Sequence, residues 1–142
     1  MKLLKYESID LVIVNFYPFK RSVELGNKHE KTIENIDIGG PAMVRAAAKN
    51  YENTAVVTNV GQYEKFYKEI TKFKGSISGS FRRLLAEEAF LDTAYYDASI
   101  SKYFTDLSNN KFPSKKVIFG EKKENLRYGE NPHQKAAFYY YG

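Results

Sequence analysis

DLVIVN, residues 10–15, decides the fold class, because four consecutive apolar residues, three of them β-branched, stand between two polar ones. A short apolar run of this kind is typical of a strand buried on both faces. Pro18 follows within the stretch 15–19 and cannot continue a strand ladder, since proline has no N–H to donate. A second apolar run, residues 54–58 (TAVVT), has the same character. We therefore expect two short buried strands.

A stretch with helical character follows each expected strand. Residues 37–41 (DIGGP) lead into the alanine-rich run 42–49, and Pro41 suits a first helical position. The second strand is followed by helical spacing over residues 61–73 and by a long helical region over 81–107, where apolar residues recur every three or four positions. Two strand-then-helix units predict an α/β domain whose parallel strands are covered by helices.

The composition excludes several classes of protein. The 142 residues contain no cysteine, which excludes a disulfide scaffold, a zinc–thiolate site and a cysteine nucleophile. His29 and His133 lie far apart, so there is no local histidine-rich metal motif. The first ten residues contain too short an apolar core for a signal peptide, and no apolar run approaches the ~18 residues that a membrane span needs. We expect a soluble, cytoplasmic protein without a metal or prosthetic group.

The net charge of +5 leaves three interpretations open. The basic excess is concentrated late in the chain, at Lys111, Lys115, Lys116, Lys122 and Lys123. These lysines suit a solvated linker, and a weak basic excess also suits an anionic small molecule such as a nucleotide. Together with the twelve tyrosines they would also suit a small module that binds single-stranded nucleic acid, which strongly salt-dependent oligonucleotide binding would reveal.

The last third of the chain predicts a linker followed by new strands. Residues 108–116 are polar and contain a proline, whereas 116–119 and 136–141 have strand character. The strand over 136–141 lies at the end of the sequence, and a lone strand cannot satisfy its backbone groups. A strand that looks central also occurs within the first fifteen residues. We therefore expect this chain to be an internal piece of a longer protein.

The first candidate site joins the end of the first strand to the turn before the first long helix. Asn15 and Tyr17 follow the strand, and open α/β sheets bind ligands beyond the carboxyl ends of their strands. Asp37 could act as a base, and Gly39 and Gly40 would let a ligand approach the N–H groups of the helix start.

Lys49 lies on the same helical face as Arg45, four residues earlier, so one of these cations could reach the site. A purely structural interpretation remains open, in which Asp37 caps the helix, the two glycines turn the chain and Lys49 is solvated. The Gly-Gly-Pro helix start is a weak signal by itself, since no phosphate-binding loop pattern accompanies it.

The second candidate site is residues 127–134 (RYGENPHQ), where polar side chains crowd between turn formers and a strand. Arg127 could bind a phosphate with two parallel hydrogen bonds, and His133 could donate a hydrogen bond or move a proton. The alternative is an exposed turn with an incidental histidine.

Four segments carry a resemblance to a known family. They are VNFYPF (14–19), IENIDIGGPAMVRAAAKN (33–50), FLDTAYYDASISKYF (90–104) and LRYGENPHQ (126–134), in this order. Together they resemble the bifunctional purine-biosynthesis enzymes AICAR transformylase/IMP cyclohydrolase. The resemblance runs from Asp10 to the end of the chain, and the second and fourth segments are its most specific parts.

The resemblance implies a division into domains. Residues 1–107 would be the C-terminal part of a cyclohydrolase domain with a methylglyoxal-synthase-like fold. Residues 108–124 would be a linker, and 125–142 the first strands of a transformylase domain with a cytidine-deaminase-like fold.

The resemblance also implies the last two steps of purine synthesis. The first is formyl transfer from 10-formyltetrahydrofolate to AICAR, and the second is cyclisation of formyl-AICAR to inosine monophosphate (IMP) with loss of water. The complete enzyme would be a homodimer with nucleotide substrates and with neither nucleic acid nor a membrane as a partner.

Residue roles follow from the same resemblance. Asp37 would accept a proton from the attacking amine, and Tyr17 would orient the base or the substrate. Asn15, Lys49 and the backbone N–H near Gly39 would stabilise the oxyanion, with Gly40 beside them in the substrate site. In the second site, Arg127 and Tyr128 would hold the nucleotide phosphate and its surroundings, with His133 in the same motif.

The sequence departs from the family pattern at both ends. The family's phosphate loop and a further catalytic lysine lie upstream of the matching region, and its Lys-His catalytic pair lies downstream. We therefore expect this polypeptide to catalyse neither reaction by itself. A non-catalytic interaction fragment of the same enzyme is the alternative.

Overall fold

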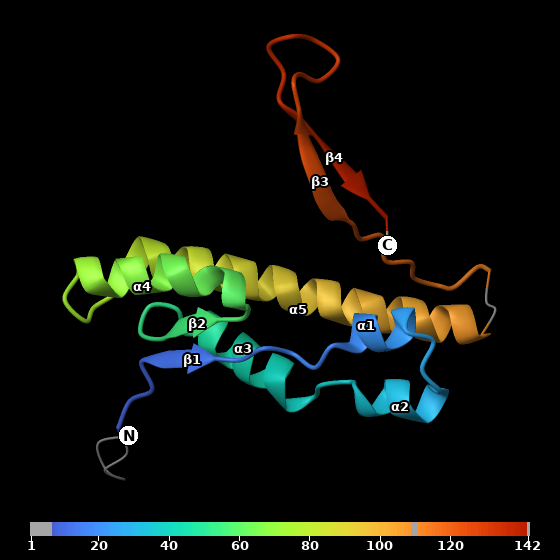
Figure 1. Cartoon of the computed structure of the whole chain (residues 1–142), viewed down its shortest axis with the longest axis horizontal. Helices are drawn as coiled ribbons and strands as arrows, with labels where there is room; N and C mark the ends of the chain where they lie inside the picture. Colours follow the sequence, from blue (N-terminus) through green and yellow to red (C-terminus); the bar gives the residue numbers. More distant parts are fainter. Residues whose placement is uncertain (1–6, 109–110, 142) are drawn as a thin grey trace. The chain divides into compact units, whose positions relative to one another are not determined.

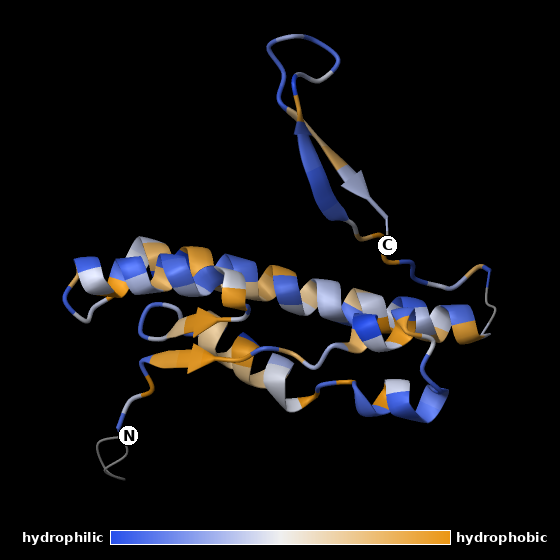
Figure 2. Cartoon of the chain, viewed as in Figure 1, coloured by the Kyte–Doolittle hydropathy of each residue, from blue (hydrophilic) through white to orange (hydrophobic). Residues whose placement is uncertain are grey.

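Two short parallel strands lie at the centre of the first part of the chain in the computed structural model, which describes residues 7–108 and 111–141. Strand β1 (Leu11–Ile13) pairs with β2 (Ala55–Val57), with Leu11 opposite Ala55 and Ile13 opposite Val57. Figure 2 shows both strands as hydrophobic segments, as the apolar runs predicted. The structure is therefore a mixed α/β arrangement with a small parallel sheet.

Helices make up most of the remaining regular structure (Figure 1). In chain order they are α1 (Phe19–Glu24), α2 (His29–Glu34), α3 (Gly39–Lys49), the 3-10 turn η1 (Val60–Gln62), α4 (Tyr63–Lys72) and α5 (Gly79–Ser108). The expected long helix is confirmed as α5, whose 30 residues extend two residues before and one residue beyond the predicted 81–107. Among the described residues, no helix is both long and apolar enough to cross a membrane.

The hydrophobic core joins α3, β2 and α5. All three residues of β2 are fully buried, and they pack in one cluster with Val44 and Ala48 of α3 and with Leu85 and Ala89 of α5. These side chains recur every three or four residues on their helices, which places them on one face. Helices α3 and α5 therefore both pack against β2.

Helix α3 begins earlier than the position of Pro41 predicts. We expected Pro41 to be the first helical residue, but α3 starts at Gly39 and Pro41 is its third residue. The reason is a hydrogen bond from the N–H of Gly40 to the Asp37 carboxylate. This N–H belongs to the second helical residue and has no acceptor within the helix, so the carboxylate supplies one. Proline is tolerated throughout the first helical turn, since its missing N–H would have no intrahelical acceptor there.

The chain divides into two compact units, Met1–Ile100 and Ser101–Gly142, with the boundary inside α5. The second unit contains an antiparallel hairpin of β3 (Glu121–Leu126) and β4 (Ala136–Tyr140). The strand predicted over 136–141 is confirmed, whereas the one predicted over 116–119 is wrong. The turn between the strands sets the pairing, because Leu126 lies opposite Ala136 and the ladder runs back from there to Glu121.

Candidate active site

Asp37 lies on the turn before α3, and backbone N–H groups from two segments donate to its carboxylate. Its Oδ1 accepts a hydrogen bond of 2.7 Å from the N–H of Gly40, and its Oδ2 accepts one of 3.3 Å from the N–H of Tyr17. The first bond caps the helix, as an aspartate before a helix commonly does. The second ties the loop after β1 to the same side chain. Three predicted site residues are thus brought together.

Gly39 and Gly40 lie in different surroundings. A Cβ atom at Gly40 would be 2.5 Å from Oδ2 of Asp37, so only glycine leaves room for the carboxylate in this position. A Cβ at Gly39 would meet no described atom within 4 Å, and Gly39 is exposed. The open side of the first turn of α3 is therefore at Gly39, where the helix dipole and the N-terminal amides favour negative charge.

Tyr96 of α5 reaches the same turn from the other side. Its hydroxyl accepts a hydrogen bond of 2.9 Å from the N–H of Asp37 and donates one of 3.0 Å to the carbonyl oxygen of Asn35. Burial raises the pKa of the Tyr96 phenol above its ordinary value of 10.0, and the negative charge of Asp37 adds to this increase. The phenol is therefore protonated at neutral pH and can donate to Asn35.

Tyr96 was missed as a site residue in the sequence, although it lies inside one of the quoted segments. A signal was available in the helical spacing. Leu85, Ala89, Thr93 and Tyr96 follow one another at intervals of four, four and three residues, which places the phenol on the buried face of α5. A buried tyrosine hydroxyl usually has a hydrogen-bond partner, but the sequence does not say which one.

Asn15 lies just beyond β1, beside a groove of about 810 Å³. Its Nδ2 donates a hydrogen bond of 3.4 Å to the hydroxyl of Tyr63, the first residue of α4. Tyr96 lines the groove too, as do Thr58 and Asn59 after β2. The groove therefore lies at the carboxyl ends of both parallel strands, where α/β sheets bind their ligands.

A polar network that the sequence did not reveal includes Thr58 and Asp92, which line this groove. The hydroxyl of Thr58 donates a 2.5 Å hydrogen bond to Oδ2 of Asp92, and Nε2 of Gln62 donates one of 2.6 Å to Oε2 of Glu88. Oε1 of Gln62 accepts one of 2.7 Å from the N–H of Thr58, so the network is continuous. Thr58 and Gln62 are both 5% exposed. These bonds fix the carboxyl end of β2 against α5.

Basic side chains of α1 also line the groove. Nζ of Lys20 donates a hydrogen bond of 3.0 Å to the hydroxyl of Tyr95 and lies 5.4 Å from the centre of its ring. Arg21 lines the same groove and is exposed. The groove therefore combines cationic groups from α1 with the Asp92 carboxylate of α5, and no single charge dominates it.

Lys49 is not brought to Asp37 by the structure. It is the last residue of α3 and is exposed, while Asp37 precedes the first residue. At 1.5 Å per residue, the ten steps from Gly39 to Lys49 span about 15 Å along the helix axis. Arg45 is also directed elsewhere, since its guanidinium lies 5.7 Å from the ring centre of Phe90. The described structure therefore separates Lys49 from the start of α3, where Asp37 and Gly39 lie.

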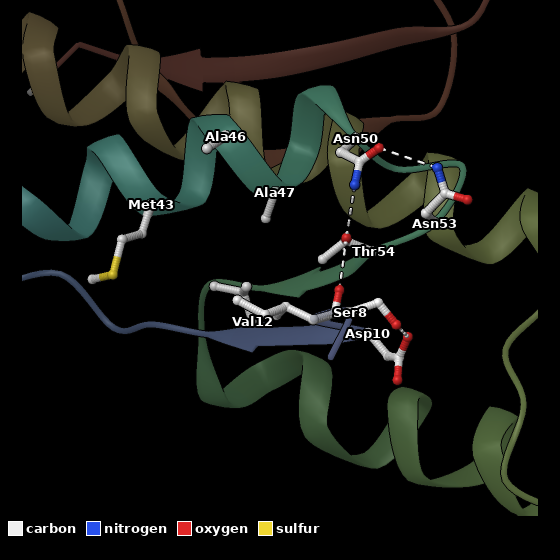
Figure 3. A pocket seen from close by; sticks show the side chains of 10 residues that line it. Ser8, Asp10, Val12, Met43, Ala46, Ala47, Asn50, Asn53 and Thr54 are labelled. Carbon is white, nitrogen blue, oxygen red and sulfur yellow. Dashed lines mark hydrogen bonds between the residues drawn. The ribbon is translucent and has the colours of Figure 1, made fainter. Parts of the chain in front are cut away.

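A second hollow, of about 630 Å³, lies between the start of β1 and the C-terminal half of α3 (Figure 3). Val12, Met43 and Ala47 give it apolar walls. Asn50 and Thr54 close one end, with a 3.1 Å hydrogen bond between their side chains and a 2.9 Å bond from Thr54 to the carbonyl oxygen of Ile9. None of the predicted site residues lines it.

The second predicted site is the turn of the β3–β4 hairpin. Arg127, Tyr128 and His133 are all exposed on it. The turn is held by a 2.9 Å hydrogen bond from the N–H of Gly129 to the carbonyl oxygen of Gln134, and by another of 2.9 Å from the N–H of Asn131 to Oε1 of Gln134. The hairpin therefore presents the three side chains from a defined turn, and Gly129 packs closely against Gln134.

The chemistry that these arrangements allow is acid–base and electrostatic. Within residues 7–108 and 111–141, no group of three or more His, Asp or Glu side chains is arranged to hold a metal ion. The first site offers a fixed carboxylate, an amide side chain and a helix N-terminus. The second offers a guanidinium, a phenol and an imidazole on one turn.

Comparison with known proteins shows the family of this chain. The family model described as AICARFT/IMPCHase bienzyme matches residues 47–141, about two thirds of the chain. The chain belongs to the AICARFT/IMPCHase bienzyme family. This assignment confirms the resemblance carried by the four quoted segments.

Relatives in this family are similar over most or all of the chain. The Bifunctional purine biosynthesis protein PurH of Rhizobium etli (strain CIAT 652) is 44% identical over 142 residues, which are 100% of this chain and 26% of that protein. The PurH protein of Bartonella bacilliformis is 49% identical over 131 residues, or 92% of this chain and 24% of that protein. The chain thus spans about a quarter of the length of these relatives.

A solved structure agrees with the fold. The structure titled "Crystal structure of ForH" superposes with a TM-score of 0.58 at 33% sequence identity. The match covers 73% of this chain and 54% of that one. It supports the mixed α/β arrangement described for this chain.

Proposed function

We propose that this chain is a segment of a two-domain enzyme that catalyses the last two steps of purine synthesis, and that its first unit contributes part of the IMP cyclohydrolase site. Membership of the bienzyme family supports the overall function. The observation that carries the site assignment is the Asp37 carboxylate, held by the N–H groups of Tyr17 and Gly40 beside the open helix start at Gly39.

The cyclisation requires a base and a group that stabilises an oxyanion. A nitrogen of formyl-AICAR attacks the formyl carbon, an N–C bond forms, and the electron pair of the C=O bond moves to the oxygen. The attacking nitrogen loses one proton and the formamide nitrogen loses another. The oxygen takes up both protons and leaves as water when the C–O bond breaks, and a C=N bond forms between the formyl carbon and the formamide nitrogen. Both reacting groups belong to one molecule, so holding them in position supplies much of the acceleration.

Asp37 is the base in this proposal. Hydrogen bonds from two backbone N–H groups hold its oxygens in a fixed place, and a carboxylate retains free lone pairs after accepting two such bonds. Tyr17 contributes its backbone N–H to this arrangement, and its exposed side chain is free to orient the substrate.

The developing oxyanion is assigned to the helix start and to Asn15. The N-terminus of α3 carries partial positive charge at Gly39, and the Asn15 amide at the carboxyl end of β1 provides a further donor. Lys49 is about 15 Å further along α3 than Gly39, so we do not assign the oxyanion to it in this proposal.

The second unit would contribute to the transformylase. We propose that Arg127 and Tyr128 hold the phosphate and surroundings of AICAR, and that His133 contacts the same nucleotide. The formyl donor would be 10-formyltetrahydrofolate. A guanidinium, a phenol and an imidazole on one exposed turn suit a phosphate and its neighbouring hydroxyl groups.

Finer features of the whole enzyme belong to the same proposal. The first unit would be part of a methylglyoxal-synthase-like fold and the second the beginning of a cytidine-deaminase-like fold. The enzyme would work as a cytoplasmic homodimer. Family membership accounts for the ordered motifs, which a small nucleic-acid-binding module would leave unexplained.

The experiment that tests the cyclohydrolase assignment is Asp37→Asn in the complete enzyme that carries this segment. General-base catalysis contributes about 10²–10⁴-fold, so we expect kcat for IMP formation from formyl-AICAR to fall by a factor in this range. Asp106→Asn is the matched control, because Asp106 is an exposed α5 residue that pairs with Lys102. Unimpaired cyclisation in Asp37→Asn would show that the base is another residue.

A further inference from the structure

Tyr96 connects helix α5 to the Asp37 turn through one buried hydroxyl. The Tyr96 side chain is 9% exposed, and its hydroxyl bonds to the N–H of Asp37 at 2.9 Å and to the carbonyl oxygen of Asn35 at 3.0 Å. These two backbone groups flank Ile36. The phenol therefore fixes both ends of a three-residue turn that precedes the carboxylate.

The ring of Tyr96 also supports the other segment that holds Asp37. Phe16 packs on it with ring centres 5.1 Å apart, and Phe19 packs edge-on at 6.3 Å. Phe16 is the residue before Tyr17, whose N–H donates to Oδ2 of Asp37. The Tyr96 ring thus lies under the loop after β1, while its hydroxyl holds the turn before α3.

We propose that Tyr96 is a positioning residue of the cyclohydrolase site, which holds the Asp37 carboxylate in place from the opposite side of the turn. This inference rests on the proposed function, because it gives Tyr96 a catalytic consequence only if Asp37 is the base. Tyr96 does not touch the reacting atoms in this proposal. It acts through the backbone of Asp37.

Removing the hydroxyl separates this role from ring packing. Tyr96→Phe keeps the contacts with Phe16 and Phe19 but leaves the Asp37 N–H and the Asn35 carbonyl without their partner. The turn would then be free to shift, and the carboxylate with it. Tyr67→Phe is the matched control, because it makes the same chemical change on an α4 side chain that is 70% exposed.

The test combines structure and rate in the complete enzyme that carries this segment. Amide hydrogen exchange of the peptide containing residues 35–40 should be about tenfold faster in Tyr96→Phe and unchanged in Tyr67→Phe, because the Asp37 N–H loses its acceptor. The kcat for cyclisation should fall about tenfold while KM stays within about twofold, because substrate binding is retained and only the base is displaced.

A double-mutant cycle decides whether Tyr96 acts through Asp37. In an Asp37→Asn background, Tyr96→Phe should cause no further loss of kcat, since the group it positions is no longer a base. Additive losses, or an unchanged kcat in Tyr96→Phe, would overturn the positioning role while leaving the base assignment intact. If Asp37→Asn itself cyclises normally, the proposed function of Asp37 fails, and the positioning role fails with it.

Discussion

At the scale of single residues, Asp37 caps a helix in the structure and is also the base that we propose. The sequence left both interpretations open, and the structure contains the cap, because Oδ1 accepts the N–H of Gly40. The same bond, with that from Tyr17, orients the carboxylate. A capping interaction stabilises the helix by about 1 kcal/mol and also gives the side chain one conformation, which a base requires.

Adjacent glycines at this helix start should respond differently to the same substitution. Gly39→Ala should gain up to about 1 kcal/mol of stability, because alanine is the better helix former and its Cβ points into open space. In Gly40→Ala the same gain in stability is cancelled by a loss of about 1 kcal/mol, because the new Cβ displaces the Asp37 carboxylate and the helix loses its capping hydrogen bond. Urea unfolding of the two variants measures this difference.

The two variants also separate stability from catalysis. Gly40→Ala should reduce cyclisation in the complete enzyme even though its stability is close to that of the parent protein, because the carboxylate has moved. Equal stability of Gly39→Ala and Gly40→Ala would contradict the close approach between Gly40 and Asp37.

At the scale of elements, α5 links the core to the candidate site. One face of this helix packs Leu85 and Ala89 against the cluster that contains β2, and Tyr96 two turns later contacts the Asp37 turn. Between them, Glu88 and Asp92 bond to the residues that follow β2. The position of the site therefore depends on the packing of a helix that begins more than forty residues after Asp37.

A pair of neighbouring leucines on α5 tests this packing. Leu85 is 1% exposed in the core, whereas Leu84 is 41% exposed. Leu85→Ala should lower the free energy of unfolding by about 2–5 kcal/mol, because it leaves a cavity against β2. Leu84→Ala should cost less than about 1 kcal/mol. Urea unfolding followed by circular dichroism measures both, and similar losses would show that α5 packs through a different face.

At the scale of the whole molecule, the chain contains two compact units and spans about a quarter of its relatives. In the first unit, Asn15 follows β1 and two hydrogen bonds join Asp37 to Tyr17 and Gly40, while the second unit presents its candidate residues on a hairpin turn. In the function that we propose, each candidate site would need further residues from the rest of the complete enzyme.

We predict that the 142-residue polypeptide by itself forms no IMP from formyl-AICAR at an enzyme-like rate, because the family resemblance implies that residues which bind the phosphate lie in other segments of the complete enzyme. Absorbance or chromatographic detection of IMP measures this, with a complete relative of the family as the positive control. Formation of IMP at a rate comparable with that control would show that these residues suffice.

Much of the fold was predictable because it follows from local patterns. The two apolar runs became β1 and β2, their parallel pairing followed from the helices between and after them, and the three-to-four spacing marked α5. The strand expected over 116–119 failed because hairpin register is set by pairing across the turn and not by the apolar character of one segment.

The sequence alone determined the local chemistry of the site, because the Asp-Ile-Gly-Gly turn and its helix cap involve residues within three positions of each other. The distance between Asp37 and Lys49 also follows from the sequence, because a helix of known length lies between them. Only the tertiary structure decided that Tyr96 holds Asp37, fifty-nine positions away. The physical reason is that a buried hydroxyl must find a partner, but the packing of α5 against the core determines which backbone group it meets.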